Sequence, residues 1–226
     1  MMLSRNLARL SSFPSCTRSL SSRIISSTSA YLAPSISGNP ATSTSPSLSP
    51  DQRQVLDSAI RVDQAGEVAA NYIYQGQMFI LGKDPATRPI LQEMWDQEKK
   101  HLTVMNLLQV QHGVRPTALW EVAKVAGWGL GAVTALMGKE AAMACTEAVE
   151  TVIGEHYDDQ LKDFDRLPSH PSIDLLKGVV RELRDDELEH LDTAVGQHSQ
   201  RAPQHALLTA VVEAGCKIAV EVCKRV

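Results

Sequence analysis

The chain has 226 residues, 43% of them hydrophobic and 21% charged, which is enough for one good-sized domain. Its formal net charge of −4 at pH 7 argues against nucleic acid as a partner, because a nucleic-acid-binding protein needs a basic stripe. Its four cysteines include no Cys-x-x-Cys pair, so they suit neither a disulfide framework nor a zinc ribbon.

Residues 1–50 differ in composition from the rest of the chain. They contain no Asp or Glu, and the first acidic residue is Asp51. A basic, serine-rich segment without acids is typical of an organellar transit peptide, and arginine or serine interrupts each apolar stretch that a secretory signal would need. We therefore expect residues 1–50 to be a mitochondrial transit peptide and disordered leader, and residues 51–226 to form the functional domain. The arginines of this predicted leader are Arg5, Arg9, Arg18 and Arg23.

From Asp51 onward, apolar residues recur at three- and four-residue steps, and no stretch alternates as a strand would. Glycine and proline residues separate the periodic segments. Long helices with short connections predict an all-α bundle. The expected helices cover 52–81, 87–112, 118–137, 139–164, 172–198, and the segment from 203 to the C-terminus.

The expected third helix, 118–137, consists mostly of Ala, Val, Leu and Gly. Its length approaches that of a membrane span, but Glu121 and Lys124 make spanning the least favoured outcome. It is either a core helix or a helix in the membrane interface, with Trp120 and Trp128 at the headgroup level. The last helix has a second apolar stretch, around Leu207, Leu208, Val211, Val212, Ile218 and Val222.

Two Glu-x-x-His motifs carry the most chemical information. They are Glu98 with His101, and Glu187 with His190. On a helix, this spacing puts the carboxylate and the imidazole on one face, so both can reach the same metal ion. For a single copy, a solvated helix face is an adequate alternative, and acidic residues around Glu187 keep that alternative open for the second copy.

Each motif is preceded by a glutamate in the apolar part of an earlier helix, Glu67 in the first case and Glu150 in the second. An unpaired carboxylate would be costly to bury there. One Glu from each of two helices and Glu-x-x-His from two others is the ligand set of ferritin-like di-metal proteins. Carboxylates with one imidazole per ion favour iron or manganese over zinc. Acids that compete for these roles are Glu93, Glu147, Glu155 and Glu189.

Several neighbours share a helix face with the candidate ligands. Tyr157 follows Glu150 by seven residues, and Asn71 and Tyr74 lie on the face of Glu67. Tyr157 is either a hydrogen-bond partner near the metals or simply a core tyrosine. We do not count His156 as a ligand.

These residues lie in stretches that resemble the demethoxyubiquinone hydroxylases, mitochondrial di-iron monooxygenases of coenzyme Q biosynthesis. The resemblance covers nearly all of the chain from Asp51. One departure is Gln64, where relatives commonly have a histidine, but this is not a ligand position in that family. The matching stretches are 61–67, 94–101, 138–150, 184–190 and 213–217.

The resemblance implies a fold, a ligand set and a reaction. The fold would be a ferritin-like four-helix bundle with two additional apolar helices. One iron would be held by Glu67, Glu98 and His101, and the other by Glu150, Glu187 and His190, with Glu98 and Glu187 bridging. The implied reaction is hydroxylation of the demethoxyubiquinol ring, in which one atom of O₂ enters the ring and the other leaves as water. The chain has no Rossmann glycine motif, so the reductant, NADH by resemblance, would act from outside through the quinone.

The same resemblance implies the surroundings in which the protein works. The substrate would be a polyprenyl quinol, reached as a peripheral protein on the matrix side of the mitochondrial inner membrane. A lipid-binding partner protein of the coenzyme Q synthesis complex would help to present it. We expect the membrane and this partner to meet the third and last helices. The ligand pattern also permits an iron-handling or peroxide-scavenging protein, or a non-catalytic scaffold of the quinone-synthesis complex.

Overall fold

The computed structural model describes residues 48–226, so the predicted leader lies almost entirely outside the described residues. Within this range every regular element is helical, which confirms the predicted all-α class. The six α-helices and one 3₁₀ helix are α2 (Pro50–Leu81), α3 (Arg88–His112), α4 (Trp120–Leu136), α5 (Lys139–Asp165), α6 (Pro171–Gly196), η2 (Ser199–Arg201) and α7 (His205–Cys223).

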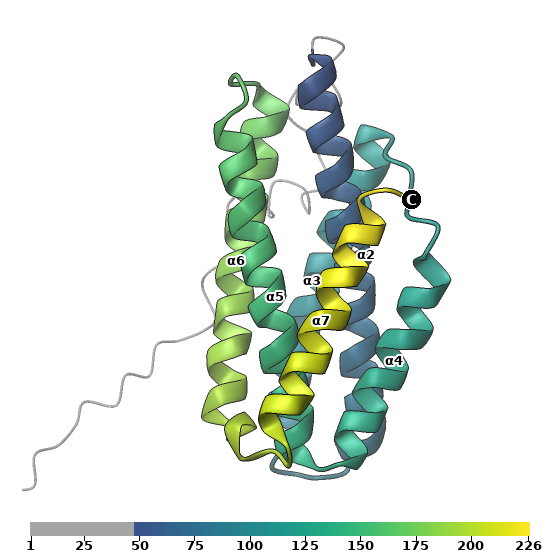
Figure 1. Cartoon of the computed structure of the whole chain (residues 1–226), viewed down its shortest axis with the longest axis vertical. Coiled ribbons are helices and arrows are strands. Elements are labelled where there is room, and N and C mark those ends of the chain that lie inside the picture. Colours follow the sequence, from purple (N-terminus) through teal and green to yellow (C-terminus); the bar gives the residue numbers. More distant parts are fainter. Residues whose placement is uncertain (1–47) are drawn as a thin grey trace, which may run out of the picture.

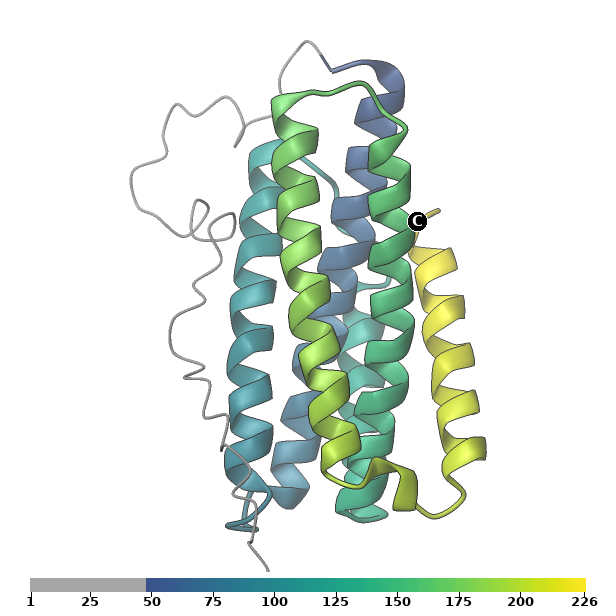
Figure 2. The same cartoon turned by 90° about the vertical axis from the view of Figure 1, so that its left-hand side faces the viewer.

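Four of these helices form the bundle, and two cover it from outside. The hairpins α2–α3 and α5–α6 lie side by side in both views (Figures 1 and 2). Helix α4 connects the two hairpins and packs mainly on α2, whereas α7 packs mainly on α5. This is the predicted four-helix bundle with two additional helices.

The helix boundaries follow local signals in the sequence. At the start of α2, Ser49 Oγ accepts a hydrogen bond from Gln52 N at 3.2 Å, and Gln52 Oε1 accepts one from Ser49 N at 2.9 Å. This reciprocal pair is a capping box, which satisfies two backbone N–H groups that the helix leaves free. The predicted fifth helix, 172–198, was too long, because His198 adopts a left-handed backbone (φ 71°) and a 3₁₀ turn follows.

Helix α4 approaches α2 very closely along a stripe of small residues. A Cβ atom added at Gly127 would lie 2.6 Å from the carbonyl oxygen of Ala69, and one at Gly131 would meet the backbone of Ile73. The opposite side of α4 exposes large apolar side chains, among them Val125 at 74%. The core-helix alternative therefore holds for one face of α4, and the other face is exposed, so the membrane-interface alternative stays a prediction. Among the described residues, no helix has the length and apolar character needed to cross a membrane.

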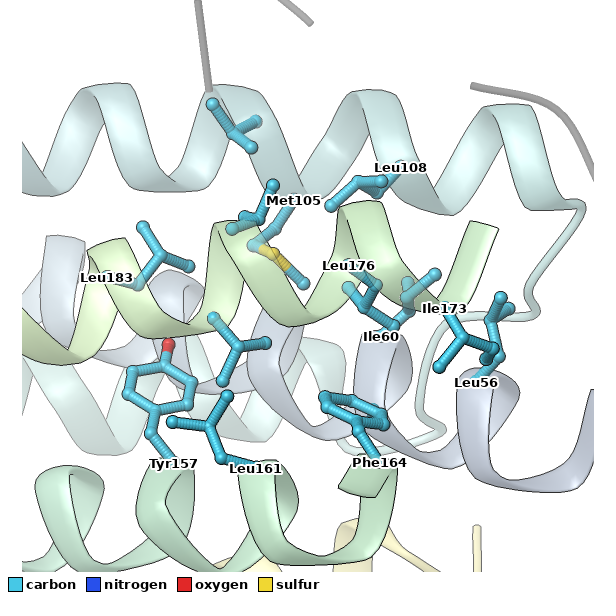
Figure 3. Close-up of a cluster of buried hydrophobic side chains, with 14 of the residues drawn as sticks. Leu56, Ile60, Met105, Leu108, Tyr157, Leu161, Phe164, Ile173, Leu176 and Leu183 are labelled. Atoms are coloured by element: carbon cyan, nitrogen blue, oxygen red, sulfur yellow. The ribbon is translucent and has the colours of Figure 1, made fainter. Parts of the chain in front are cut away.

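The bundle interior has two apolar regions. The larger one, drawn in Figure 3, joins residues of α2, α3, α5 and α6 such as Ile60, Met105, Leu161 and Leu183. A second cluster, nearer the other end, contains Tyr74, Leu91, Met94, Met143 and Ala194. On every bundle helix the predicted ligands fall between these two clusters in sequence, so they share one polar layer at mid-height.

Candidate metal centre

The six predicted ligands come together in this polar layer, and each is at most 3% exposed. They form two overlapping groups, in each of which the possible ligand atoms lie within 4.8 Å of one another. The two groups share Glu98 and Glu187, the residues expected to bridge. They are Glu67, Glu98, His101 and Glu187, and Glu98, Glu150, Glu187 and His190.

Both histidines present Nδ1 to the carboxylates. His101 Nδ1 lies 3.2 Å from Glu187 Oε1, and His190 Nδ1 lies 3.0 Å from Glu187 Oε2 and 3.1 Å from Glu98 Oε1. The Nε2 atoms point away and meet acceptors, Asp186 Oδ2 at 3.0 Å for His101 and Gln97 Oε1 at 2.6 Å for His190. An imidazole that donates from Nε2 keeps the Nδ1 lone pair free for a metal ion.

Two buried tyrosines hold the glutamates that are not shared. Tyr157 donates its hydroxyl hydrogen to Glu67 Oε1 at 2.8 Å, and Tyr74 donates to Glu150 Oε1 at 3.4 Å. Tyr157 is thus both a core tyrosine and a partner of a candidate ligand. Asn71 does not join the centre and instead accepts a hydrogen bond from Trp95 Nε1.

The electrostatics of the layer indicate a cation site. Burial is the main cause that raises the pKa values of Glu67, Glu98 and Glu150, and the neighbouring glutamates raise them further. Glu187 differs: burial acts to raise its pKa, but the nearby imidazoles of His101 and His190 lower it to about 2. Glu67 Oε2, both oxygens of Glu98 and His101 Nδ1 are buried without a hydrogen-bond partner. Such a set of buried acceptors is stable only when paired, and divalent cations fit it.

The competing acids lie elsewhere. Glu147 pairs with His205 Nε2 at 3.0 Å, and Glu155 pairs with Lys217 at 3.2 Å. Glu93 and Glu189 are exposed. His156 belongs to a separate polar group, in which its Nε2 lies 3.2 Å from Asp63 Oδ1 and 2.9 Å from Gln160 Nε2.

Sequence reasoning did not identify Gln97, Asp186 and the Asp63 group as functional neighbours. Asp186 counted there only as one of the acids that crowd the second motif. The available signal was position, because Gln97 and Asp186 each directly precede the glutamate of a Glu-x-x-His motif.

A cavity of about 410 Å³ leads from the surface to the carboxylates. Its walls come mostly from α2, α4, α5 and α7 and are largely apolar, for example Ile73, Leu130 and Val212. At one end it reaches Glu67, Glu150 and Glu187, and Tyr157 also lines it. Val122 of α4 and Val211 of α7 line it too and are well exposed, so the cavity opens between these helices.

Comparison with known proteins then identifies the family. A protein-family profile described as "Ubiquinone biosynthesis protein COQ7" matches residues 54–223. The chain belongs to this family. The predicted resemblance to demethoxyubiquinone hydroxylases is thereby confirmed.

Curated COQ7 relatives carry hydroxylase names. A "5-demethoxyubiquinone hydroxylase, mitochondrial" from Saccharomyces cerevisiae is 44% identical over 191 residues, which are 79% of this chain and 82% of that protein. A "3-demethoxyubiquinol 3-hydroxylase" from Rhodospirillum rubrum is 41% identical over 177 residues, 78% of this chain and 81% of the relative.

A third relative bears on the reductant. The Mus musculus "NADPH-dependent 3-demethoxyubiquinone 3-hydroxylase, mitochondrial" is 46% identical over 173 residues, 76% of this chain and 79% of that protein. Its name specifies NADPH, whereas the resemblance implied NADH. Among the functions that the ligand pattern left open, the names of these COQ7 relatives favour the hydroxylase.

Proposed function

We propose that this COQ7 family member hydroxylates the ring of demethoxyubiquinol with O₂ in ubiquinone biosynthesis. The observation that carries the proposal is the buried set of four glutamates and two histidines at the inner end of an apolar cavity. The names of its relatives supply the substrate class.

The proposed cofactor is a pair of iron ions. One ion is held by Glu67, Glu98 and His101, and the other by Glu150, Glu187 and His190, with Glu98 and Glu187 shared between them. Support comes from the partnerless carboxylate oxygens and from the two Nδ1 atoms that face them. Oxygen-rich donors with one imidazole per ion suit iron or manganese better than zinc. Two iron ions bound there would provide the redox chemistry that reduces O₂.

The remaining residues bind and orient. Tyr157 and Tyr74 fix one carboxylate oxygen each of Glu67 and Glu150, so the other oxygen keeps its direction toward the centre. The apolar clusters on both sides of the layer exclude water from it, which strengthens every charge interaction inside.

The cavity fits a quinol with an apolar tail. Its polar lining groups include Glu67, Tyr157 and His156, beside which the ring of a quinol would lie. Its remaining walls are apolar and reach the surface between α4 and α7, which suits a polyprenyl chain that extends outward.

The proposed location is the matrix side of the mitochondrial inner membrane, as a peripheral protein. Relatives carry "mitochondrial" in their names, and residues 1–50 have the composition of a transit peptide ahead of the hydroxylase domain at 51–226. The membrane and a lipid-binding partner protein of the quinone-synthesis complex would meet the exposed apolar faces of α4 and α7, beside the cavity opening.

The decisive experiment measures quinones by mass spectrometry in cells that lack the protein. We expect a demethoxyquinone to accumulate, and wild-type protein to convert it. Glu150→Ala should reduce this activity at least about 100-fold. Loss of a residue that only hydrogen-bonds to a metal ligand costs roughly 10–100-fold in activity, and loss of a ligand itself should cost more. Glu155→Ala is the matched control, since Glu155 lies on the same helix but is exposed and paired with Lys217.

Two results would contradict the proposal: no accumulated demethoxyquinone, or normal quinone output from a folded Glu150→Ala protein. Assays of purified protein with NADH and NADPH in parallel determine which coenzyme serves as the reductant.

A further inference from the structure

The hydrogen bonds around the six candidate ligands cross from one half of the bundle, α2–α3, to the other, α5–α6. Tyr74 follows Glu67 by seven residues on α2 but donates to Glu150 of α5. Tyr157 follows Glu150 by seven residues on α5 but donates to Glu67 of α2. The halves α2–α3 and α5–α6 are therefore related by an approximate two-fold arrangement of their contacts.

The histidines follow the same rule, with one chemical difference. Gln97, directly before Glu98, accepts from His190 Nε2 of the other half at 2.6 Å. Asp186, directly before Glu187, accepts from His101 Nε2 at 3.0 Å. The two positions are equivalent, but one holds a neutral amide and the other a carboxylate. This is the clearest departure from two-fold symmetry among the residues that contact the candidate ligands.

We propose that this difference makes the two metal positions unequal, so that the position at His101 binds the first divalent ion and the position at His190 binds the second more weakly. The inference rests on the proposed metal centre and goes beyond it, because Asp186 and Gln97 become positioning residues that determine the order of loading.

The physical reason is the strength of the hydrogen bond that each imidazole donates from Nε2. A hydrogen bond to an ionised acceptor is roughly twice as strong as one between neutral groups. Asp186 therefore holds the ring of His101 more firmly and makes its Nδ1 a better electron donor than Gln97 makes that of His190. Its side chain is 24% exposed, so solvent screens its charge only in part.

One contact acts in the opposite direction. Tyr157 binds Glu67 at 2.8 Å, more closely than Tyr74 binds Glu150 at 3.4 Å, and so withdraws more electron density from the His101 position. Tyr157 is a neutral donor and binds only one oxygen of Glu67, whose other oxygen has no hydrogen-bond partner and stays free for a metal ion. Asp186 acts through the imidazole ring on Nδ1, the nitrogen by which His101 faces the centre, so we expect its effect to prevail.

The test is an anaerobic titration of the purified protein with Co²⁺, followed by its visible absorption and by calorimetry. Wild-type protein should bind two ions per chain in two separate steps. Asp186→Asn should weaken the tighter step by about 10–100-fold and bring the two steps together. Gln97→Glu should strengthen the weaker step. His101→Ala should abolish the tight step, and His190→Ala should retain it.

Asp185→Asn is the matched control. It removes the same charge one residue away, where the carboxylate is exposed and pairs with Arg184. The inference is overturned if Asp186→Asn leaves both affinities unchanged, weakens both equally, or behaves like Asp185→Asn. Gln97→Glu tests it independently if Asp186→Asn does not fold, because an unchanged weaker step also contradicts it. Wild-type protein that binds fewer than two ions would instead refute the metal centre itself.

Discussion

At the scale of single residues, the centre concentrates negative charge where solvent is excluded. Four glutamates lie in one layer, and only the shared Glu187 has the Nδ1 atoms of both histidines within 3.2 Å of its oxygens. Burial raises the pKa values of the other three glutamates, which favours their protonated forms when no cation is bound. The layer is thus built at a cost in stability that the proposed cations would offset.

This leads to a prediction for the metal-free protein. The pKa values of Glu67 and Glu150 are raised in the folded protein, so these carboxyls stabilise the fold at pH values below their ordinary pKa of 4.5. This stabilisation is lost as the pH rises through the raised pKa values. The raised pKa values of His101 and His190 contribute below 6.5 and are lost in the same direction. Glu187 acts oppositely, but only between pH 4.5 and about 2.

We therefore expect the melting temperature of chelator-treated protein to fall between about pH 5 and pH 8. Added Co²⁺ should reverse this trend, because metal binding requires deprotonated ligands. Differential scanning calorimetry at several pH values measures both. A metal-free protein that becomes more stable over this range would contradict the electrostatic account.

At the scale of elements, α4 has two different faces, each with its own role. Its small residues allow the close contact with α2, and its large apolar residues point outward. Close packing of this kind tolerates no added atom on the contact face, because the neighbouring atoms are backbone and cannot rotate away.

Gly127→Ala should destabilise the protein by about 1–3 kcal/mol, since its Cβ would lie 2.6 Å from the carbonyl oxygen of Ala69. Gly129→Ala, on the same helix, has no atom within 4 Å of the added Cβ. It should leave stability unchanged or increase it by up to about 1 kcal/mol, through the better helix propensity of alanine. Urea unfolding compares the two variants. Equal effects would mean that α4 does not pack on α2 in this register.

At the scale of the whole molecule, α4 and α7 lie on the outside of the bundle (Figure 1). Both helices contribute residues to the cavity lining and carry exposed apolar side chains. This arrangement would let an apolar tail pass from a bilayer into the protein without crossing water. Helix α3 lies on the opposite side of the bundle from α7 (Figure 2).

Binding to vesicles of phosphatidylcholine and cardiolipin tests this orientation. Val125→Glu on α4 combined with Ile218→Glu on α7 should reduce co-sedimentation at least about tenfold, because each exposed apolar side chain contributes roughly 1.5–3 kcal/mol when buried in lipid. Val110→Glu is the control, because Val110 is 80% exposed but lies on α3. Equal losses from both variants would exclude the α4–α7 face as the contact surface.

The sequence by itself predicted the helices, apart from the end of α6, and it named the six candidate ligands that the structure brings together. Helical periodicity and the three-residue spacing of Glu98–His101 and Glu187–His190 are local properties, and the burial of Glu67 and Glu150 follows from their apolar neighbours.

Only the tertiary structure decided what surrounds the ligands. Asp186 reaches His101 across 85 residues of chain, and Gln97 reaches His190 across 93. Glu147, one turn from Glu150, pairs instead with His205 of α7. These contacts join different helices, so they depend on how the helices rotate and shift against one another. Periodicity along a single helix contains no information about that packing, and for this reason the sequence could not predict the unequal support of the two histidines.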